Sequence, residues 1–329
     1  MKAITLSDFG GPEVMQLGEV ETPSPGADQL LVKVMNTSVN RPDIIQRTGN
    51  YPPPPGDSEI LGLEIAGVVE ATGDNTTRFQ PGDRVVALVG GGGYAQYALA
   101  REDHSMTIPD SVHFEQAACI CETYITAYLN LFLLGELQGR KSVLIHGGGG
   151  GVATSAIQLC KALSPETEII VTASSGKLDR VRAQGAHHVI DYREQDFAEE
   201  IRRITGKRGV DVILDHIGAQ YLESNMKSLA LAGTLMLIGV MGGIKAELNL
   251  ATMMVKRQRI VGSVLRSRPV HEKAAIIDQF ETSVMPLFAA GTIEPLISAR
   301  FPLKDAAEAH RLMEQGGHFG KIILSNQDA

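Results

Sequence analysis

The sequence predicts an α/β protein in which a doubly wound parallel sheet is inserted into a smaller, partly open β-barrel. Three features of the 329-residue chain carry this prediction. Short strands bounded by turn residues extend to about residue 120, strands then alternate with helices, and the tail ends in one aliphatic strand, Lys321–Ser325. A single strand after a complete α/β unit is expected to return to the first domain. We therefore expect one domain from residues 1–121 plus 267–329, and a second from residues 122–266.

The barrel is predicted from short aliphatic or β-branched runs. Apolar and polar positions alternate in Leu30–Val34, and both Leu61–Glu70 and Asp83–Val89 are bounded by Gly, Pro or Asp. Short strands at irregular spacing are typical of a small, partly open barrel.

The parallel sheet is predicted from the alternation that follows a long, mostly apolar helical stretch, Phe114–Leu134. Strands are expected at 142–146, 168–173, 188–191, 210–216, 234–240 and 259–265, and helices at 152–163, 177–184, 196–205 and 221–231. Runs such as Leu235–Val240 are almost wholly apolar, as strands covered on both faces are. Two further helices, Ala274–Ala290 and Leu303–Gln315, precede the final strand.

Composition and charge restrict the class of function. The net charge is -8 and no basic stripe is present, so we expect no nucleic-acid partner. No apolar run reaches the roughly 18 residues that a membrane span needs. Three cysteines cannot form a disulfide framework, and the N-terminus lacks the features of a signal peptide. These features predict a cytoplasmic protein that acts on small molecules.

A glycine run, Gly147–Gly151, lies between an aliphatic strand and an apolar-periodic helix. Gly148, Gly150 and Ala153 have the spacing of a dinucleotide-binding turn, which needs a tight bend, a close approach of backbone to pyrophosphate, and close helix–strand packing. The pyrophosphate is then expected at the helix N-terminus, at Gly151 and Val152. The second run, Gly90–Gly93, is not followed by a helix, which favours a turn between strands.

The end of the next strand predicts which dinucleotide binds. An NAD site usually carries a carboxylate there, whereas this chain offers Ser174, Ser175 and Lys177. Two hydroxyls and an ammonium suit a 2′-phosphate, so we expect NADPH. The alternative is that Lys177 is a solvated residue in the first turn of a helix.

The chain resembles the zinc-independent medium-chain dehydrogenase/reductases, in particular their quinone oxidoreductase branch. The resemblance rests on Asn40–Gly56, Glu122–Tyr128 and Leu265–Arg268. Asn40 and Leu63 stand where zinc-dependent members carry a Cys and a His, and the four-cysteine zinc lobe is missing, so no metal is expected. The resemblance implies a Rossmann domain inserted into a GroES-like domain.

The resemblance also implies roles for individual residues. Asn40 and Thr126 are expected near the nicotinamide, and Tyr51 in the substrate pocket. Tyr192 is expected on the adenine side of the cofactor. Further contacts to the cofactor are expected from residues at strand ends and near the C-terminus: Ile217, Val240, Met241, Leu265, Arg266 and Lys321.

These observations predict NADPH-dependent, zinc-free reduction of a quinone by hydride transfer, with Asn40 and Tyr51 as hydrogen-bonding positioners. No residue stands out as a proton donor, since Asp43 reads as a helix cap. Two alternatives remain open: reduction of an activated C=C bond in an alkenal, enone or enoyl thioester, and a non-enzymatic NADPH-binding protein of the zeta-crystallin type. By resemblance, the strand Arg259–Leu265 pairs across a two-fold axis in a homodimer.

Overall fold

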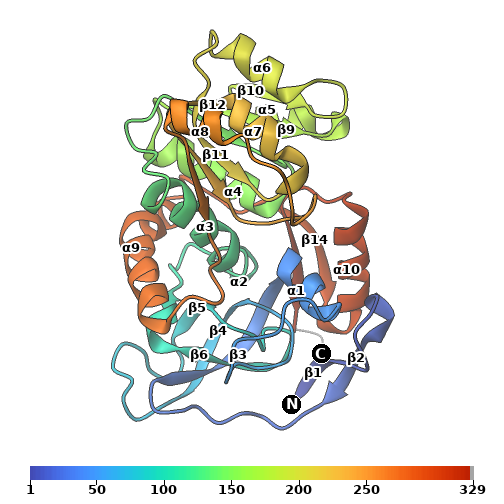
Figure 1. Ribbon diagram of the computed structural model, residues 1–329. Coiled ribbons are helices and arrows are strands. Elements are labelled where there is room, and N and C mark those ends of the chain that lie inside the picture. Colours follow the sequence, from blue (N-terminus) through green and yellow to red (C-terminus); the bar gives the residue numbers. More distant parts are fainter. Residues whose placement is uncertain (327–329) are drawn as a thin grey trace. The chain divides into compact units, whose positions relative to one another are not determined.

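The computed structural model describes residues 1–326, and the chain divides into two units. Unit 1 comprises Met1–Ile125 and the chain from Leu265 onward, and unit 2 comprises Thr126–Val264. In Figure 1 both the blue and the red ends of the chain belong to unit 1. The chain passes from unit 1 to unit 2 four residues later than expected, and it returns to unit 1 two residues earlier than expected. The amide of Glu122 is bonded to Glu64 and the guanidinium of Arg266 to Gly90, and these bonds hold both segments in unit 1.

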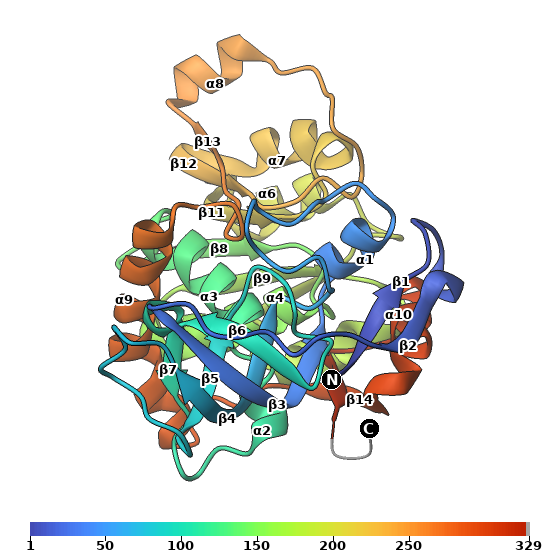
Figure 2. The ribbon, with the colours of Figure 1, turned by 90° about the horizontal axis from the view of Figure 1, so that it is seen from below.

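Unit 1 contains a seven-stranded sheet in which the order is β14-β15-β3-β4-β5-β7, with β6 also paired to β3. Figure 2 labels neighbouring strands of this sheet. Its strands are β3 (Gln29–Val39), β4 (Glu64–Thr72), β5 (Arg84–Leu88), β6 (Tyr97–Arg101), β7 (Ser105–Thr107), β14 (Ile297–Pro302) and β15 (Lys321–Ser325). A separate pair is formed by β1 (Lys2–Leu6) and β2 (Met15–Glu19). The antiparallel pairing of β15 with β3 confirms that the tail returns to the first domain.

The helices of unit 1 are α1 (Arg41–Arg47), α2 (Phe114–Ala117), α9 (Val270–Ala289) and α10 (Ala306–Gln315), together with the start of α3 (Cys121–Tyr128). Short 3-10 turns lie at Pro12–Val14, Glu102–His104 and Leu303–Asp305. The apolar stripe of α10, with Ala309 and Met313, packs with Ile322 of β15 and Val39 of β3. This packing fixes the C-terminal strand beside the segment that leads into α1.

Unit 2 is built on a six-stranded, wholly parallel sheet in the order β10-β9-β8-β11-β12-β13. Its strands are β8 (Ser142–Ile145), β9 (Glu168–Ala173), β10 (His188–Asp191), β11 (Val210–Asp215), β12 (Leu229–Leu237) and β13 (Arg259–Gly262). Its helices are α4 (Gly151–Leu163), α5 (Leu178–Ala183), α6 (Phe197–Ile204), α7 (Leu222–Ser228) and α8 (Leu250–Lys256), with 3-10 turns at Ser175–Lys177 and Ala219–Tyr221. This order is that of a doubly wound dinucleotide-binding sheet, which confirms the predicted fold class.

Two predicted helices are wrong in part. The stretch Phe114–Leu134 is broken after α2, where Ile120 N bonds Ala117 O, and α3 runs into a π-turn in which Leu134 N bonds Leu129 O. The helix predicted over 221–231 ends at Ser228 because Leu229 pairs with Val210 as the first residue of β12. In both places the apolar residues continue the helical spacing, so periodicity does not mark the break.

Candidate functional site

The glycine turn of unit 2 connects β8 to α4 and lies tightly against its neighbours. A Cβ atom at Gly148 would lie 2.6 Å from Val171 Cγ1, and one at Gly149 would lie 2.4 Å from Lys177 Cδ. Only glycine fits such approaches without displacing a neighbour. The bend predicted from the glycine spacing is therefore present, and it brings the Lys177 side chain over the turn.

The first turn of α4 offers free backbone donors. Gly150 is the N-cap and has no side chain to cap the helix. Within the described residues, the amides of Gly151, Val152 and Ala153 donate to no protein acceptor. Ala153 is buried, as the small third position of the motif requires. Free amides at the N-terminus of a 13-residue helix fit a pyrophosphate group.

Lys177 lies beside this turn, and the charges of two arginines act on it. Ser174 occupies the N-cap position of the 3-10 turn Ser175–Lys177 without a side-chain capping bond, and Lys177 is partly buried. Burial, and then the positive charges of Arg180 and Arg193, lower the pKa of Lys177. Such mutual repulsion is relieved by a bound anion, and a phosphate monoester matches the chemistry of an ammonium with two guanidinium groups. Sequence reasoning missed both arginines, although Arg193 directly follows Tyr192 at the end of β10.

The remaining predicted residues of unit 2 also follow strand ends. Tyr192 follows β10 and is 39% exposed. Ile217 follows β11, and Gly242 N donates to its carbonyl over 2.6 Å, so the loop after β12 with Val240 and Met241 lies against it. Carboxyl ends of parallel strands share one edge of the sheet. The fold thus places one set of predicted cofactor residues at this edge: Gly148, Gly150, Gly151, Val152, Ala153, Ser174, Ser175, Lys177, Tyr192, Ile217, Val240 and Met241. Thr126, on α3, is partly exposed.

In unit 1, Asn40 belongs to a buried polar network. It is the N-cap of α1, and its Nδ2 donates to Glu64 Oε1 over 2.9 Å. Lys321 Nζ donates to Asn40 Oδ1 over 2.5 Å and to Glu64 Oε1 over 3.0 Å. Both members of the Lys321–Glu64 pair are almost wholly buried. The ammonium that the sequence assigns to the cofactor is therefore directed at Glu64, and a contact of Lys321 with the cofactor stays a prediction.

Arg266 holds the loop that carries Tyr51. Its guanidinium donates to Tyr51 O over 3.2 Å, to Gly90 O over 2.9 Å and to Gln46 Oε1 over 2.8 Å, and its Cζ lies 5.1 Å from the centre of the Tyr51 ring. Arg266 and Leu265 are both buried within unit 1. In the described residues Arg266 positions Tyr51, and its predicted contact with the cofactor stays a prediction.

Asp43 is the helix cap that the sequence predicts. Its carboxylate accepts from the backbone amides of Asn40 over 2.7 Å and Gly62 over 3.2 Å, and from Tyr94 Oη over 3.2 Å. Burial raises the pKa of Asp43 to about 6, against the lowering effect of these bonds. His310 Nε2 lies 3.0 Å from the same Tyr94 hydroxyl, so α10 is linked to the start of α1.

Glu122 is an acidic residue that sequence reasoning did not single out. Its amide donates to Glu64 Oε2 over 2.9 Å, while its partly buried carboxyl has no hydrogen bond or ion pair to any described residue. Burial and then the charge of Glu64 raise the pKa of Glu122 to about 8. Burial and then the charge of Glu122 raise the pKa of Tyr51. Nothing in the helical pattern distinguishes this glutamate, because its environment comes from distant segments.

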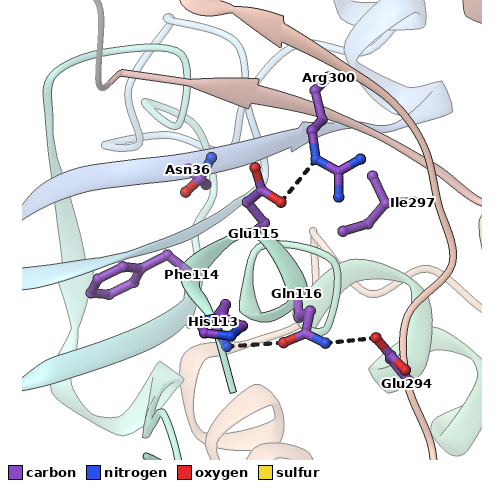
Figure 3. Close-up of a pocket in the computed structure, with 8 residues that line it drawn as sticks. All are labelled: Asn36, His113, Phe114, Glu115, Gln116, Glu294, Ile297 and Arg300. Atoms are coloured by element: carbon purple, nitrogen blue, oxygen red, sulfur yellow. Dashed lines mark hydrogen bonds and ion pairs between the residues drawn. The ribbon is translucent and has the colours of Figure 1, made fainter. Parts of the chain in front are cut away.

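Unit 1 also has a polar cleft of about 380 Å³ (Figure 3). Glu115 and Arg300 form an ion pair of 2.9 Å in it, and Gln116 donates to Glu294 over 2.8 Å. It is lined by Asn36, His113, Phe114, Glu115, Gln116, Glu294, Ile297 and Arg300. None of the predicted site residues lines this cleft. Over residues 1–326, no group of three or more His, Cys, Asp or Glu side chains is arranged to hold a metal ion.

Comparison with known proteins places the chain in a family. Residues 26–110 match a profile described as the alcohol dehydrogenase GroES-like domain, and residues 184–324 match one described as zinc-binding dehydrogenase. The chain is 34% identical to the Homo sapiens quinone oxidoreductase over 98% of its own length and 97% of that relative.

Solved structures give the same placement. The Escherichia coli quinone oxidoreductase complexed with NADPH superposes with a TM-score of 0.89 at 29% identity, covering 99% of this chain and 100% of that one. An apo enoyl reductase, JamJ, superposes with a TM-score of 0.88 over 98% of each chain, but at 24% identity it shares the fold alone. The chain belongs to the medium-chain dehydrogenase/reductase family, in its zinc-independent quinone oxidoreductase branch.

Proposed function

We propose that this oxidoreductase reduces quinones by zinc-free hydride transfer from NADPH. The observation that carries the proposal is the Lys177 side chain, which lies over the glycine turn that leads into the free amides of α4 and on which the charges of Arg180 and Arg193 act. A helix N-terminus suits the pyrophosphate of either nicotinamide cofactor, and an ammonium with two guanidinium groups matches the chemistry of the 2′-phosphate that distinguishes NADPH from NADH. The similarity to relatives named quinone oxidoreductase, one of them complexed with NADPH, supports both halves of the proposal.

The chain's own residues are proposed to position the reactants. Bound NADPH supplies the hydride, and the protein orients it and excludes water. Asn40 and Tyr51 orient the substrate by hydrogen bonding, and Thr126 lies near the nicotinamide. A quinone suits such a site because its carbonyls are already electrophilic and its reduced anion spreads charge over the ring. It therefore needs less assistance from a Lewis acid than a simple alcohol or ketone does.

Steady-state assays test the proposal. Purified protein is expected to oxidise NADPH in the presence of an ortho-quinone, with a kcat/KM that exceeds those for alkenals with NADPH and for the same quinone with NADH. Faster turnover of alkenals would establish reduction of activated C=C bonds as the function instead. A clear preference for NADH would contradict the role given to Lys177, Arg180 and Arg193.

We also propose a homodimer formed through β13. This strand is the last in its sheet, and the neighbouring α8 exposes Leu250, Met254 and Val255, each by about 70%. Pairing of β13 with its copy would cover both the strand edge and these side chains. Light scattering is expected to give twice the chain mass, and a monomeric mass for the wild type would contradict the proposal. Met254→Glu is expected to shift the protein toward the monomer.

We propose a cytoplasmic location. Cys119, Cys121 and Cys160 are free and buried, and burial raises the pKa of each thiol, which suits a reducing compartment. Within residues 1–326, no helix combines the length and apolar character needed to cross a bilayer. Cell fractionation that finds the protein outside the cytosol would contradict this location.

A further inference from the structure

Reduction of a quinone consumes a proton as well as a hydride, so the proposed function needs a proton donor. Unit 1 brings three carboxyl groups into one electrostatic group with Tyr51 and Arg266: Asp43, Glu64 and Glu122. A carboxyl group can donate a proton only if it is protonated in the working enzyme and free to reach the substrate. These two requirements distinguish Glu122 from Asp43 and Glu64.

Asp43 and Glu64 are already bound by several donors. Asp43 accepts from two backbone amides and from the Tyr94 hydroxyl. Glu64 accepts at one oxygen from Ser38 Oγ over 2.6 Å, from Asn40 Nδ2 and from Lys321 Nζ, and at the other from the Glu122 amide. Donors and a buried ammonium stabilise the charged form of a carboxyl. Both carboxyl groups therefore have structural partners, supplied by residues of α1, β3 and β15 and by the backbone of Gly62 and Glu122.

Glu122 differs from both. Its backbone is fixed by the bond to Glu64 Oε2, yet its carboxyl contacts no partner among the described residues and is partly open to solvent. The groups that act on it come from four other segments: Glu64 and Asp43 disfavour its charged form, and Lys321 and Arg266 favour it. Burial and the two carboxylates prevail, which places its pKa at about 8. This environment favours the protonated form of Glu122.

We propose that Glu122 is the proton donor of the quinone reduction, an inference that rests on the function proposed above. The hydride and its electron pair add to the quinone, which gives the hydroquinone monoanion. The O–H bond of Glu122 breaks while an O–H bond forms on the phenolate oxygen, and neutral hydroquinone is released. The Glu122 carboxylate then regains a proton from water before the next turnover. Tyr51, which Arg266 holds in place, positions the substrate beside it.

The variant Glu122→Gln tests this role because it keeps the size of the side chain and removes its acid. With an ortho-quinone and NADPH, the wild-type kcat is expected to fall above about pH 8, as Glu122 loses its proton. In Glu122→Gln, kcat is expected to be lower by about 100-fold and to lose this alkaline limb, while both KM values are retained. The control is Glu115→Gln, which removes a carboxyl of an exposed ion pair in the first turn of α2 and is expected to leave kcat and its pH profile unchanged.

A titration followed by carboxyl ¹³C NMR, together with the assays, distinguishes a failure of the donor role from a failure of the proposed function. A resonance that is present in the wild type and absent from Glu122→Gln is expected to titrate near pH 8, and titration near pH 4.5 would overturn the inference. An unchanged kcat and pH profile in Glu122→Gln would also overturn it and leave quinone reduction standing. A wild type that binds NADPH and reduces no quinone would refute the proposed function itself, and the donor role would fall with it.

Discussion

The buried ion pair between Lys321 and Glu64 allows a stability prediction of stated size. Their charged atoms lie 3.0 Å apart, and the side chains are 4% and 0% exposed. The substitution Lys321→Met keeps a long apolar stem and removes the ammonium. It leaves Glu64 as a buried carboxylate without its cation, and it deprives Asn40 Oδ1 and the Val39 carbonyl of their donor.

The loss of one partner from a buried pair costs about 3–5 kcal/mol. Glu64 keeps three donors in the variant, from Ser38, Asn40 and the Glu122 amide, so we expect the lower end of this range, about 3 kcal/mol. A domain of about 150–250 residues loses about 2–4 °C of Tm per kcal/mol. The transition of unit 1 is therefore expected to move down by about 6–12 °C.

Calorimetry and urea unfolding at pH 7 measure the effect. The matched control is Lys227→Met, which breaks an exposed pair with Glu223 whose side chains are 63% and 78% exposed, and which is expected to leave the Tm unchanged because solvent screens such a pair. The double variant Glu64→Gln/Lys321→Met is expected to be more stable than Lys321→Met alone, because it no longer buries an uncompensated charge. The reasoning is refuted if Lys321→Met costs no more than the control, or if the two changes in the double variant are additive.

Three further predictions concern the cofactor and the pH dependence of stability. Lys177→Ala is expected to raise the KM for NADPH by about 10–100-fold, from the loss of about 1.5–3 kcal/mol, and to leave the KM for NADH unchanged in steady-state assays. Burial lowers the pKa of His146 to about 3, so the stability that its neutral form supplies is present above about pH 6.5 and is lost toward pH 3; urea midpoints are expected to fall less steeply with acid in His146→Gln. Glu122 changes the stability in the opposite direction with pH. Its pKa is raised, so the stability that its neutral form supplies is lost as the pH rises from about 4.5 to about 8. Glu122→Gln is therefore expected to melt at a higher temperature than the wild type at pH 9 and not at pH 5.

The parts of the site that could be predicted from the sequence depend on local pattern. The glycine turn, the small residue at Ala153 and the strand ends at Ile217 and Val240 follow from the order of strands and helices, since parallel strands place their carboxyl ends together. The direction of Lys321 could not be predicted in this way. Its partner Glu64 is 257 positions distant, and a Lys at the start of a strand gives no sign of which carboxylate it meets.

Arg266 and Glu122 are two further residues whose environment could not be predicted from the sequence. The sequence assigns Arg266 to the cofactor because it follows the sixth strand, whereas its guanidinium binds the carbonyl of Gly90, 176 positions away. Glu122 reads as an ordinary residue at the start of a helix, and its raised pKa comes from burial and from Glu64. Electrostatic environment is a property of the assembled site and not of any sequence window.

The charges of unit 1 explain why one carboxyl is structural and another is free to hold a proton. Asp43 and Glu64 are balanced by Lys321 and Arg266, so ionisation of Glu122 would add an unpaired negative charge to a largely buried group. Such a site favours the neutral acid. It follows that Lys321→Met, which removes one of the two cations, should raise the pKa of Glu122 further above 8 and move the alkaline limb of kcat with it. If the carboxyl resonance of Glu122 titrates at the same pH in that variant, the charge of Lys321 does not act on Glu122.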